Sequence, residues 1–190
     1  MEFIKSNFKL DAKGLACPMP IVKTKKAMKE LENGHVIEVQ ATDKGSKADI
    51  KAWAESTNNQ YLGTIENGEV LYHYIRKSSD ENAIEKRFET TTSNEELSQK
   101  LNSKEKMTVL DVREEAEYAF NHIPNAKSIP LGDLEERLSE LDKDHEIYII
   151  CRTGNRSDFA AQLLAKNGFK KVFNVVPGMS QWSGETVSIG

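Results

Sequence analysis

Short apolar runs alternate with amphipathic stretches over the first 76 residues. Asn67-Gly68, a dipeptide typical of hairpin turns, separates the last two apolar runs. Ser46 is placed to cap the second of two predicted helices. The pattern predicts strands at Phe8–Leu10, Val36–Ala41, Tyr61–Ile65 and Glu69–Ile75, and helices at Pro18–Leu31 and Ser46–Ser56. The resulting order, βαβαββ, indicates a small two-layer α/β sandwich on a mixed sheet.

From residue 93 onward, strand and helix patterns alternate. Alternation of this kind is typical of a parallel central sheet covered by helices on both faces. Binding and catalytic sites of such sheets form outside the carboxyl ends of the strands, and Cys151 stands directly after a strand. The pattern predicts helices at Asn94–Leu101, Glu114–Phe120, Leu134–Leu141, Ser157–Asn167 and Met179–Trp182, and strands at Thr108–Asp111, Ser128–Ile129, Ile147–Ile150 and Lys171–Asn174.

A polar stretch separates the two patterns. Residues 77–92 cluster Ser, Asp, Asn and Thr, and their apolar positions have no sustained period. Such a composition is typical of a linker. The chain of 190 residues is therefore predicted to hold domains at 1–76 and 93–190, each of the size of a small domain.

Composition and charge exclude several classes of protein. Apolar residues make up 38% of the chain and charged residues 29%, so a disordered chain is not expected. The longest apolar runs are far shorter than the roughly 20 residues of a membrane span. Residues 1–77 have a net charge of +2 and residues 78–190 one of −6, neither of which is typical of a nucleic-acid-binding surface. With two cysteines and no signal segment, we expect a soluble cytoplasmic protein without a nucleic-acid or membrane partner.

The first cysteine lies directly before a predicted helix. In Cys17-Pro18-Met19-Pro20, Pro18 and Pro20 fix the start of that helix, because the N–H groups of a first turn have no intrahelical partner. The sulfur of Cys17 is then expected near the positive end of the helix dipole, which favours the thiolate over the thiol. The alternative is a buried apolar cysteine that only packs.

The second cysteine opens a loop between an apolar strand and a helix. The segment Cys151-Arg152-Thr153-Gly154-Asn155-Arg156-Ser157, called the Cys151 loop below, combines a glycine with two arginines. A tight loop at a helix N-terminus directs several backbone N–H groups to one point, and arginines add positive charge there. This combination is expected to stabilise a thiolate or a bound anion.

Both cysteine segments resemble known families. Residues 7–76, with the sequence Leu10–Pro20, resemble the sulfur carriers of the TusA/SirA type, whose signature is CPxP. Residues 93–186 resemble the rhodanese family. The marks of that second resemblance are Asp111-Val112-Arg113-Glu114 with Glu117-Tyr118, His122-Ile123-Pro124-Asn125-Ala126, the Cys151 loop and Pro177–Trp182. Asn121 and Asn125 stand where rhodaneses usually have Gly, and Asn adopts a left-handed backbone more readily than most residues, so the turn is still expected to form.

The two resemblances together imply a fused sulfurtransferase. They imply that Cys151 takes sulfur from a small sulfane-sulfur donor, such as thiosulfate or a low-molecular-weight persulfide, and exchanges it with Cys17. An acceptor thiol or a sulfur-relay protein is the expected partner. The residues implied to hold the persulfide anion are Arg152, Thr153, Gly154, Asn155, Arg156 and Ser157, with Asp111 and Arg113 in support. No metal or organic cofactor is expected, because the four histidines lack metal-ligand spacing.

Two other functions compete with this interpretation. Cysteine phosphatases have five residues between Cys and Arg, whereas Cys151 and Arg156 are separated by four, and the smaller ring suits a sulfur atom better than a phosphate. Asp158 is the only nearby candidate for the general acid that a phosphatase needs. The second alternative is a thiol redox sensor or partner-binding protein in which Cys17 and Cys151 form a switch without catalytic turnover.

Overall fold

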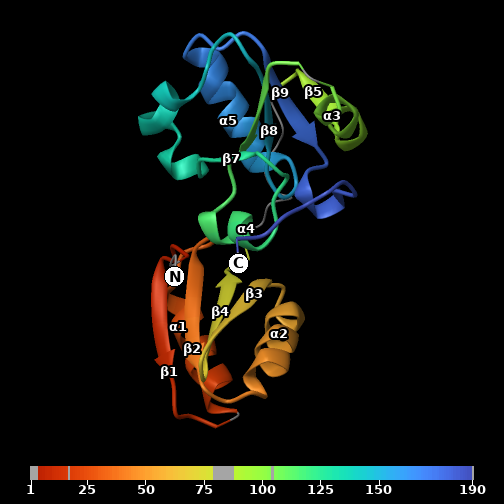
Figure 1. Cartoon of the computed structure of the whole chain (residues 1–190). Helices are drawn as coiled ribbons and strands as arrows, with labels where there is room; N and C mark the ends of the chain where they lie inside the picture. The colour runs from red at the N-terminus through yellow and green to blue at the C-terminus, as the bar shows by residue number, and fades with distance from the viewer. Residues whose placement is uncertain (1–3, 17, 79–87, 104, 190) are drawn as a thin grey trace. The chain divides into compact units, whose positions relative to one another are not determined.

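The chain forms two compact units, Met1–Ser79 and Asp80–Gly190 (Figure 1). The structure is a computed structural model that describes residues 4–16, 18–78, 88–103 and 105–189. Both units are of the predicted α/β class. Among the residues described, no helix is both long and apolar enough to cross a membrane.

The first unit is a four-stranded sheet with two helices packed on one face. The strand order is β1-β2-β4-β3, with β1 parallel to β2 and the other neighbours antiparallel. The predicted βαβαββ order and mixed sheet are therefore confirmed. Apolar side chains of both helices meet those of the central strands in one core. The elements are β1 (Phe8–Ala12), α1 (Met19–Glu30), β2 (Val36–Ala41), α2 (Ser46–Ser56), β3 (Gln60–Asn67) and β4 (Val70–Arg76).

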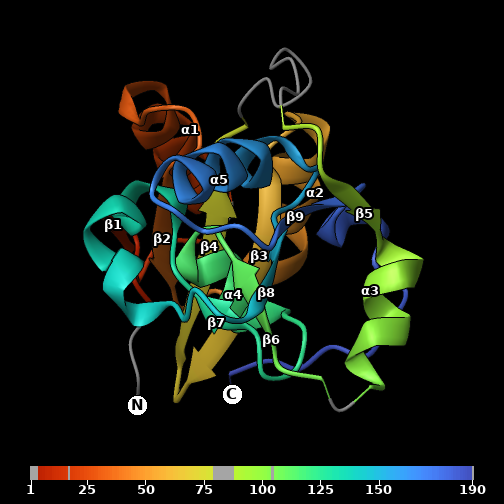
Figure 2. The same cartoon turned by 90° about the horizontal axis from the view of Figure 1, so that it is seen from above.

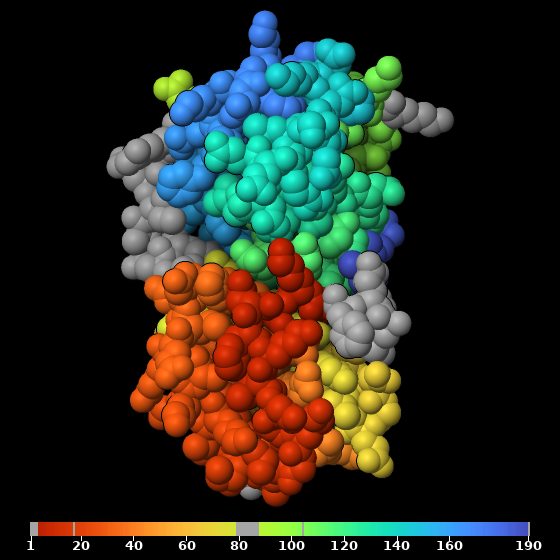
Figure 3. All heavy atoms as spheres, turned by 90° about the vertical axis from the view of Figure 1, so that its left-hand side faces the viewer, coloured from red at the N-terminus to blue at the C-terminus, as the bar shows by residue number. Residues whose placement is uncertain are grey.

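The parallel pair of strands brings two loops to one edge of this sheet. Ala12 pairs with Ala41 at the carboxyl ends of β1 and β2, so the loops that follow these strands start side by side. The Gly14 N–H donates to the Thr42 hydroxyl at 2.9 Å and joins the two loops. Figure 3 shows the early part of the chain, drawn red and orange, at the surface of the first unit.

A buried histidine links α2 to the sheet of the first unit. The ring of His73 lies between the hydroxyl of Ser46, 2.9 Å from Nε2, and that of Thr64, 2.8 Å from Nδ1. The prediction that Ser46 caps α2 is therefore wrong, because Gly45 takes the cap position and the Ser46 hydroxyl is used by His73. Burial, with a smaller contribution from the charge of Lys47, lowers the pKa of His73 from 6.5 to about 4.

The second unit is a five-stranded parallel sheet in the order β5-β9-β8-β6-β7. One apolar core packs the sheet against α5 and the turns after β7, and a second core packs its other face against α3. Figures 1 and 2 show α5 and α3 on different sides of the sheet. The elements are β5 (Thr91–Ser93), α3 (Asn94–Leu101), β6 (Met107–Asp111), α4 (Glu115–Phe120), β7 (Lys127–Ser128), η1 (Leu131–Asp133), η2 (Glu135–Glu140), β8 (Glu146–Ile150), α5 (Asn155–Lys166), β9 (Val172–Val176) and η3 (Met179–Gln181), where η denotes a 3₁₀ helix.

Several elements differ from their predicted form. Strand β5 covers the last two residues of the predicted linker 77–92 together with Ser93, and residues 79–87 of that linker fall outside the described residues. The helices predicted at Leu134–Leu141 and Met179–Trp182 are short 3₁₀ helices. Asn125 adopts a φ of +64°, as the predicted turn requires, whereas Asn121 has an extended backbone.

The buried neutral histidine makes the first unit sensitive to acid. In the folded chain the His73 pKa is about 4, and in the unfolded chain it is near 6.5, so the unfolded chain binds the proton first. The free energy of unfolding of the first unit is therefore highest above about pH 7. It falls by up to about 3 kcal/mol as the pH drops from 6.5 to 4. We expect His73→Gln to flatten this dependence.

The measurement is urea unfolding between pH 4 and 7, followed by the fluorescence of Trp53 in a Trp182→Phe background. His35→Gln is the matched control, because the side chain of His35 is 40% exposed. An equal acid loss of stability in wild type and His73→Gln would contradict the prediction.

Candidate active site

Cys151 follows β8 directly and precedes the N-terminus of α5. Its side chain is buried, with 1% of the residue surface exposed. The Gly154 N–H donates to the Cys151 sulfur at 3.1 Å. Gly154 makes this possible with a left-handed backbone, φ +95°, which turns the chain from the loop into α5. The first N–H groups of α5 have no intrahelical acceptor, so the sulfur lies at an electropositive helix end.

Two polar side chains connect the sulfur to the neighbouring strand. The hydroxyl of Ser157 is 3.2 Å from the Cys151 sulfur and donates to Oδ1 of Asn174 at 2.6 Å. Nδ2 of Asn174 in turn donates to the Gly154 carbonyl at 3.2 Å. All four residues are buried, so these hydrogen bonds form a closed chain around the sulfur.

The turn after β9 holds the carbonyl groups of the Cys151 loop. The N–H of Met179 donates to the Cys151 carbonyl at 2.8 Å, and that of Ser180 donates to the Arg152 carbonyl at 2.9 Å. Because the C=O and N–H of a trans peptide point in opposite directions, the N–H groups of Arg152 and Thr153 point away from this turn.

The close approach of this turn requires glycine. A Cβ at Gly178 would lie 2.6 Å from the Cys151 carbonyl oxygen, and its backbone has φ +94° and ψ −163°, a region populated almost only by glycine. The buried amide of Asn94 fixes Gly178 from the other side, with its Nδ2 donating to the Gly178 carbonyl and its Oδ1 accepting from the Gly178 N–H.

Asp111 and Arg113 form a buried ion pair at the end of the neighbouring strand. The guanidinium of Arg113 donates to both oxygens of Asp111, at 2.7 to 3.1 Å, and to the carbonyl of Asn121 at 2.6 Å. Burial alone would lower the pKa of Arg113, but the charge and hydrogen bonds of Asp111 outweigh it, so the pKa is raised. The pair therefore ties β6 to the loop after α4.

Arg156 is held by a buried carboxylate. Its guanidinium donates to both oxygens of Glu117 on α4, at 2.7 and 3.1 Å. Glu117 also accepts from the Glu114 N–H and so closes the first turn of α4. A buried Arg–carboxylate pair with two parallel hydrogen bonds fixes the guanidinium in one orientation.

The structure brings most of the predicted site residues together in one loop. Gly154, Asn155 and Ser157 are buried, and Arg152 and Thr153 are half-buried beside the sulfur-bearing residue. Asp111 and Arg113 lie on the neighbouring strand and on the loop after it, at the same carboxyl edge of the sheet.

The other predicted cysteine, Cys17, lies outside the described residues. The residues around it are described. Pro18 takes the cap position of α1 and Pro20 lies in the first turn, as predicted, with the Pro20 carbonyl accepting from the Thr24 hydroxyl at 2.7 Å.

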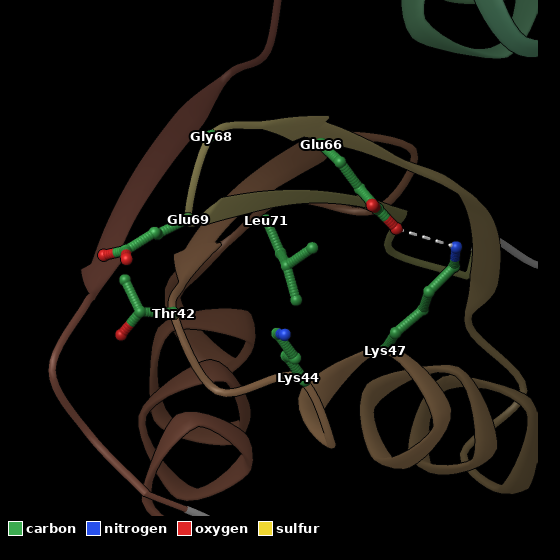
Figure 4. A pocket seen from close by; sticks show the side chains of 7 residues that line it. All are labelled: Thr42, Lys44, Lys47, Glu66, Gly68, Glu69 and Leu71. Carbon is green, nitrogen blue, oxygen red and sulfur yellow. Dashed lines mark hydrogen bonds and ion pairs between the residues drawn. The ribbon is translucent and has the colours of Figure 1, made fainter.

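A polar hollow lies at the same edge of the first unit as the loop that leads to Cys17. It has a volume of about 650 Å³. Thr42, whose hydroxyl accepts the Gly14 N–H, is one of the residues that line it. Figure 4 shows Lys47 on α2 reaching the carboxylate of Glu66 across it, at 3.2 Å. The hollow is therefore lined by charges of both signs. Its lining residues are Thr42, Lys44, Lys47, Glu66, Gly68, Glu69 and Leu71.

Within the described part of the chain, no group of three His, Cys, Asp or Glu side chains is placed to hold a metal ion.

Comparison with known proteins identifies both units. Residues 8–77 match the family described as sulfurtransferase TusA, and residues 93–185 match the rhodanese-like domain. A Bacillus subtilis protein named "Putative sulfur carrier protein YrkF" is 53% identical over 183 residues, which cover 96% of this chain and 99% of that protein. The chain belongs to this family of two-domain sulfur carriers. Its predicted resemblance to both families is confirmed.

Single-domain relatives match each half separately. "Putative sulfur carrier protein YrkI" of Bacillus subtilis is 55% identical over 74 residues, 39% of this chain and 99% of that protein. A solved rhodanese-like domain protein from Staphylococcus aureus is 33% identical, with a TM-score of 0.50, and covers 53% of this chain and 98% of that one. A rhodanese-like domain from Anabaena is 30% identical, also with a TM-score of 0.50, and the match covers 54% of this chain and 81% of that one. The fold of the rhodanese domain is thus shared with solved structures.

Four residues of the site were not predicted from the sequence. Asn94, Glu117, Gly178 and Asn174 contact the Cys151 loop or its supporting turn. Glu117 and Gly178 lie in segments that the rhodanese resemblance marked, without a role given to either. The others come from separate elements, and a single polar residue in a helix or strand gives no local signal.

Loss of the Glu117 charge is expected to destabilise the rhodanese domain. Glu117→Gln keeps the shape of the side chain but leaves the guanidinium of Arg156, which is 13% exposed, without its counter-charge. Removing one partner of a buried pair costs about 3 kcal/mol. The measurement is urea unfolding followed by Trp182 fluorescence.

Glu140→Gln is the control, because Glu140 forms ion pairs at the surface with Arg137 and Lys127. We expect a much smaller change in that variant. Equal losses of stability in the two variants would show that burial of the Glu117–Arg156 pair has no special effect.

Gly178→Ala is expected to disturb the Cys151 loop. The new methyl group would meet the Cys151 carbonyl, and the backbone conformation is strained for any residue but glycine. We expect a loss of about 3 kcal/mol in unfolding free energy, measured by thermal or urea unfolding. Gly132→Ala is the matched control, because a Cβ at Gly132 meets no atom within 4 Å. Unchanged stability of Gly178→Ala would contradict the close packing described here.

Proposed function

We propose that the protein takes sulfane sulfur onto Cys151 as a persulfide and relays it to Cys17. The donor is thiosulfate or a low-molecular-weight persulfide, and a thiol of a small molecule or a sulfur-relay protein is the final acceptor. No metal or organic cofactor takes part. The observation that carries this proposal is the buried Cys151 sulfur, which accepts the Gly154 N–H at the N-terminus of α5. Family membership of both domains supports the same chemistry.

The first step loads Cys151. The thiol loses its proton, and the thiolate attacks the sulfane sulfur of the donor. A new S–S bond forms on Cys151, and the bond between that sulfur and the rest of the donor breaks. Its electron pair leaves with sulfite, or with a thiolate when the donor is a persulfide. Backbone N–H groups of the loop and the arginines are suited to the negative terminal sulfur that remains.

The second step moves the terminal sulfur to Cys17. The Cys17 thiolate attacks the outer sulfur of the Cys151 persulfide, and the Cys151 sulfur leaves as a thiolate. Cys17 precedes Pro18 at the start of α1, where the helix dipole favours an anion. Fusion of both domains in one chain raises the local concentration of one thiol near the other, to about millimolar for short flexible tethers.

The relay predicts an order of sulfur loading. Wild type, Cys17→Ser and Cys151→Ser are exposed to thiosulfate, and separately to a glutathione persulfide, and the intact masses are recorded. We expect Cys17→Ser to gain one sulfur atom and Cys151→Ser to gain none, because Cys151 loads first. Wild type is expected to carry sulfur on both cysteines.

Other results would contradict the relay in distinct ways. Normal loading of Cys17 in Cys151→Ser would mean that the TusA domain accepts sulfur independently. A disulfide between Cys17 and Cys151 with no added sulfur would favour the redox-sensor alternative. In a steady-state assay with thiosulfate and cyanide, turnover must be lost in Cys151→Ser.

A further inference from the structure

We infer that Asn174 is a positioning residue that holds the resting Cys151 as a neutral thiol by controlling the direction of the Ser157 hydroxyl. The hydrogen bonds around the sulfur lead to this assignment, because the Gly154 carbonyl, which can only accept, fixes the roles of the groups that follow it. The role of this hydrogen bonding in catalysis rests on the proposed sulfur transfer. The hydrogen-bond assignment does not depend on it.

The orientation of the Asn174 amide is fixed by its two partners. One amide atom lies 3.2 Å from the Gly154 carbonyl oxygen, which can only accept, so this atom is the NH₂ group. The other amide atom is therefore Oδ1, which can only accept, and it lies 2.6 Å from the Ser157 hydroxyl. The reverse orientation would place two carbonyl oxygens against each other in a buried site.

The Asn174 amide then determines the direction in which the hydroxyl proton of Ser157 points. Because Oδ1 of Asn174 needs a donor, the Ser157 hydroxyl proton points to Asn174 and not to the sulfur. At 3.2 Å from the sulfur, Ser157 offers only lone pairs in that direction, so the Cys151 S–H is the donor. A hydrogen bond donated by the thiol stabilises the neutral form.

Ionisation of Cys151 thus requires a change at Ser157. A thiolate would face the lone pairs of the hydroxyl unless the hydroxyl rotates to donate to it. That rotation leaves Oδ1 of Asn174 buried without a donor from Ser157, which costs free energy. The Gly154 N–H favours the anion, whereas Asn174 opposes it through Ser157. In the proposed reaction, this opposition keeps the sulfur protonated between turnovers.

Charged groups near the sulfur also influence its ionisation. Strand β9 and the turn after it, Pro177–Trp182, carry no charged side chain. The charged groups of the site are the Asp111–Arg113 pair, the Arg156–Glu117 pair, Arg152 in the Cys151 loop and Asp158 in the first turn of α5. The test keeps all six unchanged, so a shift between variants does not come from an altered charge.

The test is the pH dependence of alkylation of Cys151 by iodoacetamide, in a Cys17→Ser background. Asn174→Leu keeps the branched shape of the side chain but removes both polar atoms, so the Ser157 hydroxyl is released to donate to the thiolate. We expect the midpoint of alkylation to fall by about one pH unit and the rate at pH 7 to rise roughly tenfold, the size of one hydrogen bond of about 1.4 kcal/mol.

A double-mutant cycle with Ser157→Ala separates this role from a merely structural one. If Asn174 acts through Ser157, then Asn174→Leu shifts the midpoint in the presence of Ser157 and leaves it unchanged in Ser157→Ala. The inference is overturned if the midpoint does not fall, or if the same shift occurs without Ser157. Asn174→Ala serves as a second variant should Asn174→Leu fail to fold, as judged by circular dichroism.

An infrared measurement tests the assignment without any change at the site. Cys17→Ser leaves one S–H group, and we expect its stretching band at neutral pH to lie at the lower frequency of a hydrogen-bonded S–H. A band at the frequency of a free S–H would overturn the assignment. Sulfur loading is a separate readout, so a failure to load sulfur would refute the proposed function while leaving the alkylation shift intact.

Discussion

The two hydrogen bonds from the turn after β9 to the Cys151 loop are the constraint on which the site depends. Met179 and Ser180 take up the carbonyl groups of Cys151 and Arg152, and the following N–H groups then point to the other side of the loop. A loop that presented its carbonyl oxygens to the sulfur would repel an anion there. The close approach of Gly178, and the Asn94 amide that holds it, are therefore part of the geometry that would suit an anion in the proposed function.

The guanidinium of Arg156, a positive charge of the site, is also held in one place. Arg156 belongs to the loop, yet both of its terminal nitrogens donate to Glu117. This pairing lowers the net charge that Arg156 can supply to a persulfide and fixes where the guanidinium lies. The remaining stabilisation of an anion falls to the backbone N–H groups, to the dipole of α5 and to Arg152. Glu117 thereby limits how strongly Arg156 attracts an anion, and it also fixes the position of the Arg156 guanidinium.

The general organisation of the chain could be predicted from its sequence, because periodicity and turn residues are local signals. The βαβαββ order, the parallel sheet and the position of Cys151 after a buried strand all follow from such signals. Strand β5 could not be predicted, since three residues, Thr91–Ser93, are too few to show a period, and its pairing with β9 is a tertiary contact. Periodicity of apolar residues also could not predict that Glu135–Glu140 forms a 3₁₀ helix.

The site shows the same division between local and tertiary information. The Cys151 loop is recognisable because its chemistry lies in seven consecutive residues. Asn174 is not, since it is one polar residue in an otherwise ordinary strand. Glu117 stands in a segment that resembles rhodaneses, but its role, like that of Asn174, arises only when α4 or β9 packs beside the loop. These two residues oppose the anion that the loop favours, one through a hydroxyl group and one through a charge. In the proposed transfer the same sulfur is a nucleophile, a carrier and a leaving group in turn, so a site that only stabilised the anion would hold sulfur too firmly to pass it on.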